Sequence, residues 1–517
     1  MPRTRLEHAA VVAVAVVLAL LSTLVPREGA EADLTALSGP LRVDPETNLV
    51  PPSQRALARF EDGTFVVVYR DSSAYPNSGQ WAQRYDAQGA PIGTRALVSQ
   101  GGSAQPSVAG RDDGSFLVVW ESESPGPGLD LRLMAADATP LGSELHFSTA
   151  TAVHRNPDVA ALAGGGFVVV WDSYYSPFLP GFDVEMGGQR FDSSAAPVGN
   201  PFHVNSYTTG YQQRGRVSAD DNGRFVVVWQ SGDFGGAGQD GAYFGVIGRR
   251  FDATASPFGT EFVVNTFTTY SEDSPDVAMH SDGSFVVVWR TQYGDDEPLG
   301  VISDSVTLRR YASSGQPLGD EIHLNSYITG LQTQPVIAMD DDGSFVVAFT
   351  SASGYNTFDN RDGDGAGIFA RCFVASGQPV GEDFIVNTYT TADQTLASIA
   401  SDGDGDFVVA WHGAEAVTGY FQDLEPNGIA VRRFGRGQLG GGGVCGDPIA
   451  PPGSLRGSAL VTATDALFAL QAAVLLVQCE LCVCDVNDSG GVTASDALII
   501  LQTAVGLAAQ LTCPPCA

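Results

Sequence analysis

The sequence predicts an all-β fold: a seven-bladed β-propeller of four-stranded antiparallel blades, followed by a small α-helical domain of paired loops and helices. One apolar strand pattern, Phe-Val-Val-Val-Trp in its clearest copy at 285–289, recurs seven times at spacings of 51 to 62 residues. A period of this length is typical of repeat architectures. After residue 453 the pattern gives way to two segments with apolar residues at helical spacing.

Each repeat contains four strand-like pieces. The first, such as 275–278, leads through an Asp-Gly or Asn-Gly dipeptide into the apolar strand, and that dipeptide suits a tight hairpin. The apolar strand is continuous rather than alternating, so we expect both of its faces to be covered. A variable loop follows, then a strand that ends in Arg and an aromatic residue, then a last strand such as 261–266. Four short antiparallel strands per repeat describe a propeller blade.

The two ends of the repeat region predict that the ring closes. The region opens with a spare fourth-type strand at 40–44 and stops after a third-type strand at 429–434. Pairing these two segments would complete the seventh blade and remove the exposed sheet edges. An open row of sandwich domains is the alternative, although it would not need complementary ends.

The composition and the N-terminus indicate an exported protein. The chain of 517 residues has a net charge of −32, which disfavours nucleic-acid and anionic-lipid partners. Two arginines precede an apolar run at 9–25, and 30–32 offers a small-x-small cleavage site, so residues 1–32 are predicted to be a signal peptide. An uncleaved anchor is the alternative. We expect a secreted, extracellular or cell-surface protein with no membrane contact after signal cleavage.

Composition changes again after the repeats. The predicted propeller covers residues 33–435, a Gly- and Pro-rich linker 436–453, and the C-terminal domain 454–517. In an exported chain, clustered cysteines indicate disulfides, although six allow 15 connectivities and a zinc site is an alternative. The disulfide candidates are Cys445, Cys479, Cys482, Cys484, Cys513 and Cys516.

One loop of the C-terminal domain has the ligand spacing of a calcium site. Oxygen donors stand at loop positions one, three, five, seven, nine and twelve, and Gly490 stands at six, where the sharp turn needs glycine. The predicted ligands are Asp485, Asn487, Ser489, Gly491 through its carbonyl, Thr493 and Asp496. A polar helix cap is the alternative.

A second, tentative calcium set lies within the repeats. Asn360, Asp362 and Asp364 place oxygen donors at alternate positions before a glycine. Arg371 occupies loop position twelve, where an acidic ligand belongs, so an ordinary acidic turn is the alternative. The sequence therefore predicts one calcium ion, held by the loop at 485–496.

The segment 454–510 resembles a dockerin, a duplicated loop–helix calcium module that binds cohesin domains. Its second loop matches that family at Asp485, Asn487, Gly490, Thr493 and Asp496. The resemblance implies a cohesin-like protein partner. The family's partner-selecting positions fall on Ala463, Thr464, Ala494 and Ser495. The first loop departs from the family pattern, because Arg456 stands at a ligand position.

The repeats of residues 40–435 resemble the propeller-like repeats of secreted bacterial surface proteins. That resemblance implies an extracellular module and no particular activity. The sequence assigns no catalytic residue, because acidic loops are frequent and nothing selects a pair among them.

The favoured function is a secreted, non-catalytic binding or adhesion propeller. Its ligand would be a glycan or a surface protein, bound by the variable loops. A calcium-dependent dockerin-like module would tether it to a cohesin-type partner. The alternative is a secreted polysaccharide-degrading enzyme, a glycoside hydrolase or lyase, of a cellulosome-like assembly.

The calcium prediction can be tested on residues 440–517 by calorimetry. One site is expected, and Asp485→Ala should abolish it, because the change removes the first carboxylate ligand. Two sites, or none, would refute the predicted ligand set.

Overall fold

The computed structural model describes the strands and turns of the repeat region. The described residues are 34–36, 41–43, 54–72, 78–100, 106–122, 126–148, 152–174, 184–233, 238–241, 243–292, 303–325, 330–353, 361–403, 405–413 and 428–436. The predicted signal peptide, linker, C-terminal domain, calcium loop at 485–496, partner-binding positions and six clustered cysteines lie outside these ranges. Within them the chain forms strands, turns and bends but no helix, so no helix there could cross a membrane.

Within the described ranges the strands form five hydrogen-bonded sheets of four, five or eight strands, and one parallel pair joins the two halves of each eight-stranded sheet. Antiparallel pairing alone groups the strands into the successive units given below. Units 1 and 2 are β3 (Leu57–Arg59), β4 (Phe65–Asp71), β5 (Gly79–Tyr85) and β6 (Pro91–Gln100), then β7 (Ser107–Gly110), β8 (Phe116–Ser122), β9 (Gly128–Met134) and β10 (Leu145–Phe147). Units 3 and 4 are β11 (Val153–Leu162), β12 (Gly166–Tyr174), β13 (Val184–Phe191) and β14 (Pro197–His203), then β15 (Tyr211–Ala219), β16 (Phe225–Gly232), β17 (Phe244–Phe251) and β18 (Phe262–Val263).

The remaining units continue the same order. Units 5 and 6 are β19 (Glu272–Met279), β20 (Phe285–Gln292), β21 (Asp304–Tyr311) and β22 (Ile322–His323), then β23 (Leu331–Met339), β24 (Phe345–Ala352), β25 (Gly367–Phe373) and β26 (Pro379–Ile385). Unit 7 is β27 (Thr395–Ser401), β28 (Asp406–His412) and β29 (Ile429–Arg436), joined by the N-terminal strands β1 (Leu34–Ala36) and β2 (Leu41–Arg42).

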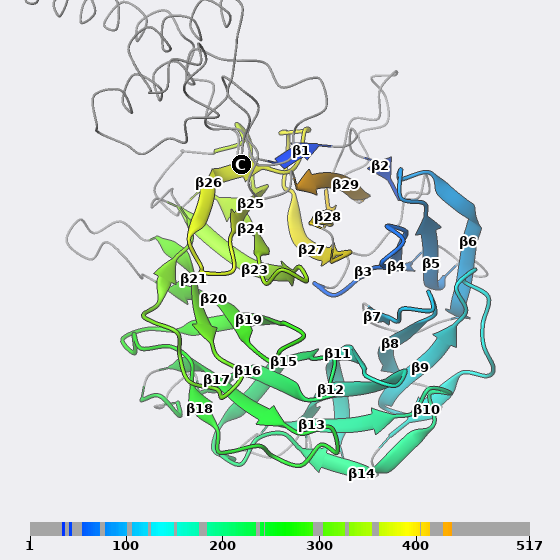
Figure 1. Cartoon of the computed structure of the whole chain (residues 1–517), viewed down its shortest axis with the longest axis horizontal. Coiled ribbons are helices and arrows are strands. Elements are labelled where there is room, and N and C mark those ends of the chain that lie inside the picture. The colour runs from blue at the N-terminus through cyan, green and yellow to red at the C-terminus, as the bar shows by residue number, and fades with distance from the viewer. Residues whose placement is uncertain are drawn as a thin grey trace, which may run out of the picture.

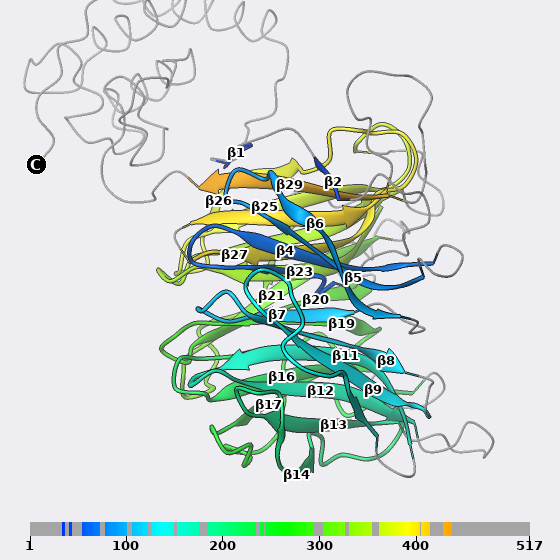
Figure 2. The ribbon, with the colours of Figure 1, turned by 90° about the vertical axis from the view of Figure 1, so that its right-hand side faces the viewer.

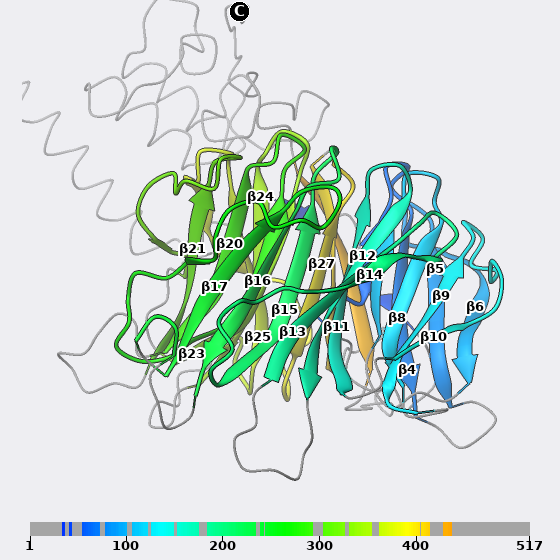
Figure 3. The same cartoon turned by 90° about the horizontal axis from the view of Figure 1, so that it is seen from below.

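The units are arranged as a ring (Figure 1). The first strand of each unit (β3, β7, β11, β15, β19, β23 and β27) lies nearest the centre, and the last strands lie at the periphery. The two side views show the sheets of successive units lying alongside one another (Figures 2 and 3). The predicted all-β, propeller-like fold is therefore confirmed for the repeat region.

The N-terminal strand closes the ring as the sequence predicted. β2 pairs with β29 in antiparallel register, with Leu41 opposite Val431 and Arg42 opposite Ala430. The backbone N–H of Val43 then donates to the carbonyl of Ile429 at 2.9 Å. Strands from the two ends of the repeat region thus complete unit 7.

Apolar packing between neighbouring units forms the core. The second strand of each unit is buried along its Phe-Val-Val-Val-Trp stretch; Val287 and Trp289, for example, have no exposed surface. One apolar cluster joins Phe65 and Val67 of unit 1 to Val408 and Ala410 of unit 7. The first and last units therefore share an apolar core, as consecutive units do. Both faces of the apolar strand are covered, as its continuous hydrophobicity predicts.

The recurring polar motifs of the repeat serve the fold. Arginines on the third strand donate to a fourth-strand carbonyl of the preceding unit, as Arg249 does to Val204 at 2.7 Å and Arg309 to Val264 at 2.9 Å. The Asn of the Val-Asn-Thr motif accepts a backbone N–H of the third strand, as Asn265 does from Val246 at 2.8 Å. These bonds satisfy buried backbone groups at the ends of strands.

Candidate functional site

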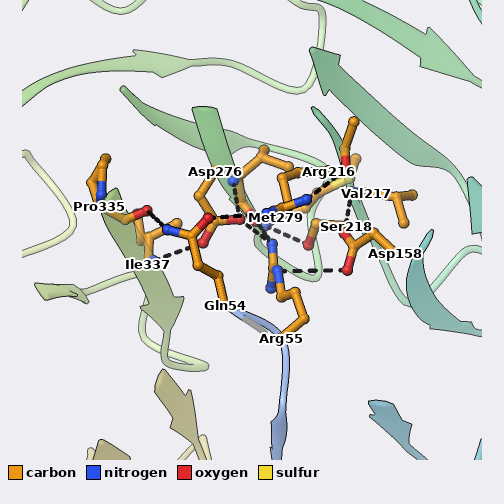
Figure 4. Close-up of polar contacts among 12 residues, drawn as sticks. Gln54, Arg55, Asp158, Arg216, Val217, Ser218, Asp276, Met279, Pro335 and Ile337 are labelled. Carbon is orange, nitrogen blue, oxygen red and sulfur yellow. Dashed lines mark hydrogen bonds and ion pairs between the residues drawn. The ribbon is translucent and has the colours of Figure 1, made fainter. Parts of the chain in front are cut away.

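The centre of the ring holds a buried ionic network (Figure 4). Arg55, just before β3, forms an ion pair with Asp276 of β19 through Nη2. Its Nε lies 3.8 Å from Oδ1 of Asp158, on β11. Nη2 also donates to the carbonyl of Val277 at 3.0 Å. One guanidinium from the start of unit 1 therefore contacts the inner strands of units 3 and 5.

Both carboxylates of this network also bond the neighbouring units. Asp158 accepts the N–H of Val217 at 2.8 Å, and Asp276 accepts the N–H of Ile337 at 2.9 Å. The Asp158 and Asp276 side chains are only 1% and 2% exposed. Burial raises the pKa of Asp276, against the attraction of Arg55. Because each of these contacts joins one unit to another, the network holds the ring together.

A second polar cluster lies where the inner strands bulge. β11, β15, β19, β23 and β27 each shift register in their first half, and each shift contains a non-glycine residue with positive φ. These residues are Asn156 (49°), Arg214 (57°), Ser274 (53°), Gln334 (54°) and Leu396 (56°). Positive φ is costly for residues other than glycine and collects at functional sites, and bulges re-aim side chains there.

At the bulges of β11 and β15, the carboxylates of Glu121 and Asp172 accept hydrogen bonds from the residues with positive φ. The N–H of Asn156 donates to Oε1 of Glu121 at 2.8 Å, and its Nδ2 donates to Oδ2 of Asp172 at 2.8 Å. The N–H of Arg214 donates to Oδ1 of Asp172 at 2.9 Å. Glu121 comes from the end of β8 and Asp172 from the end of β12, so units 2, 3 and 4 meet here.

The cluster continues into unit 5. Nη1 of Arg214 donates to Oγ of Ser274 at 3.2 Å, and that hydroxyl donates to Oδ1 of Asp273 at 3.0 Å. Arg290 then pairs with Asp273 at 3.1 Å and with Asp304 at 2.7 Å. We call Glu121, Arg155, Asn156, Asp172, Tyr174, Arg214, Asp273, Ser274 and Arg290 the bulge cluster.

The two carboxylates on Asn156 have different environments. Asp172 has no exposed surface, and burial raises its pKa to about 7, although bonds from Asn156 and Arg214 oppose the shift. Glu121 is only partly buried. Burial, then the charge of Asp172, raises the pKa of Tyr174 to about 12. Near neutral pH the cluster therefore combines a carboxyl that retains a proton for part of the time, that of Asp172, with the more exposed acidic side chain of Glu121. Acid–base catalysis uses two such groups in different environments.

Glu272, beside the cluster, behaves as a glutamine. Gln212 and Gln332 occupy its position in units 4 and 6. Glu272 is fully buried, and burial, followed by the nearby charges of Asp240 and Glu321, raises its pKa to about 9. The protonated carboxyl has the hydrogen-bonding capacity of an amide. Its Oε2 lies 3.4 Å from Nδ2 of Asn265.

Only part of the tentative calcium set at 360–364 is described. Asp362 is mostly buried and lies 3.5 Å from Nδ2 of Asn387 through Oδ2, while Oδ2 of Asp364 accepts the N–H of Ala392 at 3.4 Å. Asn360 lies outside the described residues. Within those residues no group of three or more acidic, His or Cys side chains could hold a metal. Calcium at either predicted loop stays a prediction.

The bulge cluster was not predicted from the sequence. Two of its acidic members directly follow buried tryptophans, because Glu121 follows Trp120 and Asp172 follows Trp171. An acidic residue after a buried aromatic is the sequence signal that could have located the cluster. The residues with positive φ in these bulges, Asn156 and Arg214, are not glycines, so the sequence does not show that they turn toward solvent. The sequence predicts that the variable loops bind the ligand, whereas the residues of the bulge cluster lie on strands, near their ends.

Comparison with known proteins gives structural matches alone. No family model and no curated protein matches the chain. The phage phi92 endosialidase is similar over 78% of this chain and 69% of its own, with 11% identity and a TM-score of 0.45. The α-L-arabinanase of Penicillium chrysogenum is similar over 77% of this chain and 97% of its own, with 15% identity and a TM-score of 0.39. The GH93 α-L-arabinofuranosidase of Fusarium graminearum is similar over 78% of this chain and 98% of its own, with 12% identity and a TM-score of 0.41.

These matches contradict the predicted main function. Each of the three proteins is named as a glycan-cleaving enzyme, which agrees with the alternative of a polysaccharide-degrading enzyme and not with a non-catalytic binding and adhesion propeller. No match supports the predicted dockerin-like module. At identities of 11 to 15% and TM-scores below 0.5, the matches assign no reaction and no residue role to this chain.

The central network predicts a stability effect. Arg55→Met should lower the free energy of unfolding by about 3 kcal/mol, because it leaves buried carboxylates without their cation. Urea denaturation would measure it. The double variant with Asp276→Asn should regain part of the loss, since one unpaired charge is gone. A loss below about 0.5 kcal/mol for Arg55→Met would contradict the role of the network.

Glu272 predicts a pH effect of opposite sign to that of a paired carboxylate. Its folded pKa of about 9 lies above the ordinary 4.5, so stability is complete below pH 4.5 and declines as the pH rises toward 9. Glu272→Gln should therefore be more stable than the wild type by roughly 4 to 5 kcal/mol at pH 8, with the difference vanishing near pH 4.5. Thermal denaturation across that range would measure it, with the exposed Glu382→Gln as the control. Parallel pH profiles for wild type and Glu272→Gln would rule out a buried proton at this site.

Proposed function

We propose that the chain is a secreted enzyme that cleaves glycosidic bonds of a polysaccharide at the bulge cluster, on a seven-bladed propeller in which each unit is one blade. One observation carries the proposal: Asn156 bonds two carboxyls, those of Glu121 and Asp172, and burial raises the pKa of Asp172 to about 7. Glycoside hydrolysis uses two carboxyls in this way, one as acid and one as base or nucleophile.

The environments assign the two roles. Asp172 would donate a proton to the leaving oxygen, because it is the carboxyl whose pKa is raised to about 7. Glu121 would act as base or nucleophile, because it is the more exposed of the two carboxyls. Asp172 is covered in the described state, so Asn156, whose side chain is exposed, has to move aside when substrate binds.

The termini support the remainder of the proposal. The export signal at 1–32 fits a secreted enzyme, and the loop at 485–496 fits a single calcium ion. The dockerin-like module at 454–517 would then attach the enzyme to a cohesin-like partner in a cellulosome-like assembly.

The enzymatic proposal predicts release of reducing ends from at least one member of a polysaccharide panel. Glu121→Gln and Asp172→Asn should each lower the rate by at least about 100-fold, because each removes a proton-transfer group. Glu185→Gln, in unit 3 but outside the bulge cluster, is the matched control and should keep the rate. An unsaturated product would instead identify a lyase. Full activity in both carboxylate variants would exclude this pair.

The pH profile gives an independent check. Asp172 must be protonated to act as the acid, so the rate should fall as the pH rises through about 7. A wild-type rate that stays constant from pH 6 to pH 9 would remove Asp172 from that role.

A further inference from the structure

The bulge cluster carries two exposed arginines, Arg155 and Arg214, in an acidic protein. We infer that Arg155 and Arg214 bind the carboxylates of an anionic, uronate-type glycan, an inference that rests on the proposed action on polysaccharide and names its substrate class. Both side chains are exposed, and they stand on the adjoining inner strands β11 and β15. The two charges therefore face solvent at neighbouring positions around the ring.

Arg155 and Arg214 differ from other arginines of the ring, which form ion pairs within the fold. Arg55 and Arg290 each contact two carboxylates. Within the described part of the chain, no ion pair joins Arg155 or Arg214 to an acidic side chain. Arg214 donates to the Ser274 hydroxyl at 3.2 Å, and the Arg155 guanidinium lies 5.8 Å from the centroid of the Tyr174 ring. Among the described residues, most donors of the two guanidinium groups therefore have no acidic partner.

The charge balance around the two arginines also favours an anion. The chain has 59 acidic and only 27 basic residues, so most exposed arginines would be expected to find a carboxylate. Asp172 is buried and accepts the backbone N–H of Arg214. Asp273 is already paired with Arg290.

The geometry of the group suits a sugar acid. A guanidinium presents a planar fork of donors that matches a carboxylate, and it is less strongly hydrated than an ammonium group. Arg155 stands next to Asn156 in sequence, and Arg214 bonds Asp172 through its own N–H. A carboxylate bound by the two arginines would therefore place its sugar beside the two proposed catalytic carboxyls. The ring of Tyr174 offers an apolar face for the sugar.

Binding by the full chain can be measured by calorimetry with polygalacturonate as the probe. The same polymer with its carboxylates methyl-esterified is the matched ligand control, and dextran sulfate tests sulfate esters as the source of negative charge. We expect binding to polygalacturonate that weakens as salt rises, and little binding to the esterified polymer. Arg155→Gln and Arg214→Gln should each weaken binding by at least about tenfold, because each removes charged hydrogen bonds. Arg224→Gln, at the β15–β16 turn, makes the same charge change at the other end of the hairpin and should bind as the wild type does.

Equal binding to the esterified polymer, wild-type affinity in both arginine variants, or tighter binding to dextran sulfate would overturn the inference. Cleavage of a neutral polysaccharide without affinity for polygalacturonate would refute the inference and leave the enzyme. Binding of polygalacturonate with no cleavage of any polymer would refute the enzyme and leave the inference.

Discussion

The structure depends on the need to cover the apolar strand of every unit on both faces. A strand such as β20, buried along its Phe-Val-Val-Val-Trp stretch, requires a neighbouring sheet on each side. Consecutive units cover the apolar faces of each other's strands. In an open row, however, the first and the last unit would each leave one apolar face exposed to water. The cluster that joins Phe65 to Val408 removes both exposed faces at once. The pairing of β2 with β29 then adds backbone hydrogen bonds to a closure that hydrophobic burial favours.

Closure also brings backbone N–H groups of the inner strands together at the ring centre, and the apolar core offers these groups no hydrogen-bond acceptor. Only the first strand of each unit faces the ring centre, where backbone N–H groups of one unit lie beside the next. Asp158 and Asp276 satisfy such groups across unit boundaries, and Arg55 compensates their charge. The same reasoning explains the arginines of the third strand and the Asn of Val-Asn-Thr, which bond carbonyls and N–H groups at the outer side of the sheets. Most of the repeated polar residues are therefore structural.

The sequence predicts the fold well and the candidate site poorly, for a physical reason. Burial on both faces leaves a long apolar run, and hairpin turns leave Asp-Gly, so the units and the closing strand at 40–44 can be found by local pattern. Arg55 and Asp276 are 221 residues apart, and no local pattern relates them. The bulges are hidden too, because Asn156 and Arg214 adopt positive φ without a glycine to mark it. The predicted C-terminal calcium module lies outside the described residues and remains a prediction.

The bulge cluster differs from the structural network in how its polar groups are used. In the central network the side-chain oxygens are covered and bond backbone of neighbouring units, so a change there acts on stability. At the bulges, Arg155, Asn156 and Arg214 reach solvent from a strained backbone, and the arginines pair with no described carboxylate. The free-energy cost of positive φ at these residues has to be offset by other interactions, and the apolar clusters packed between the units can offset it. Substituting exposed residues of the cluster should therefore change binding and turnover more than folding, whereas substituting Arg55 should do the reverse.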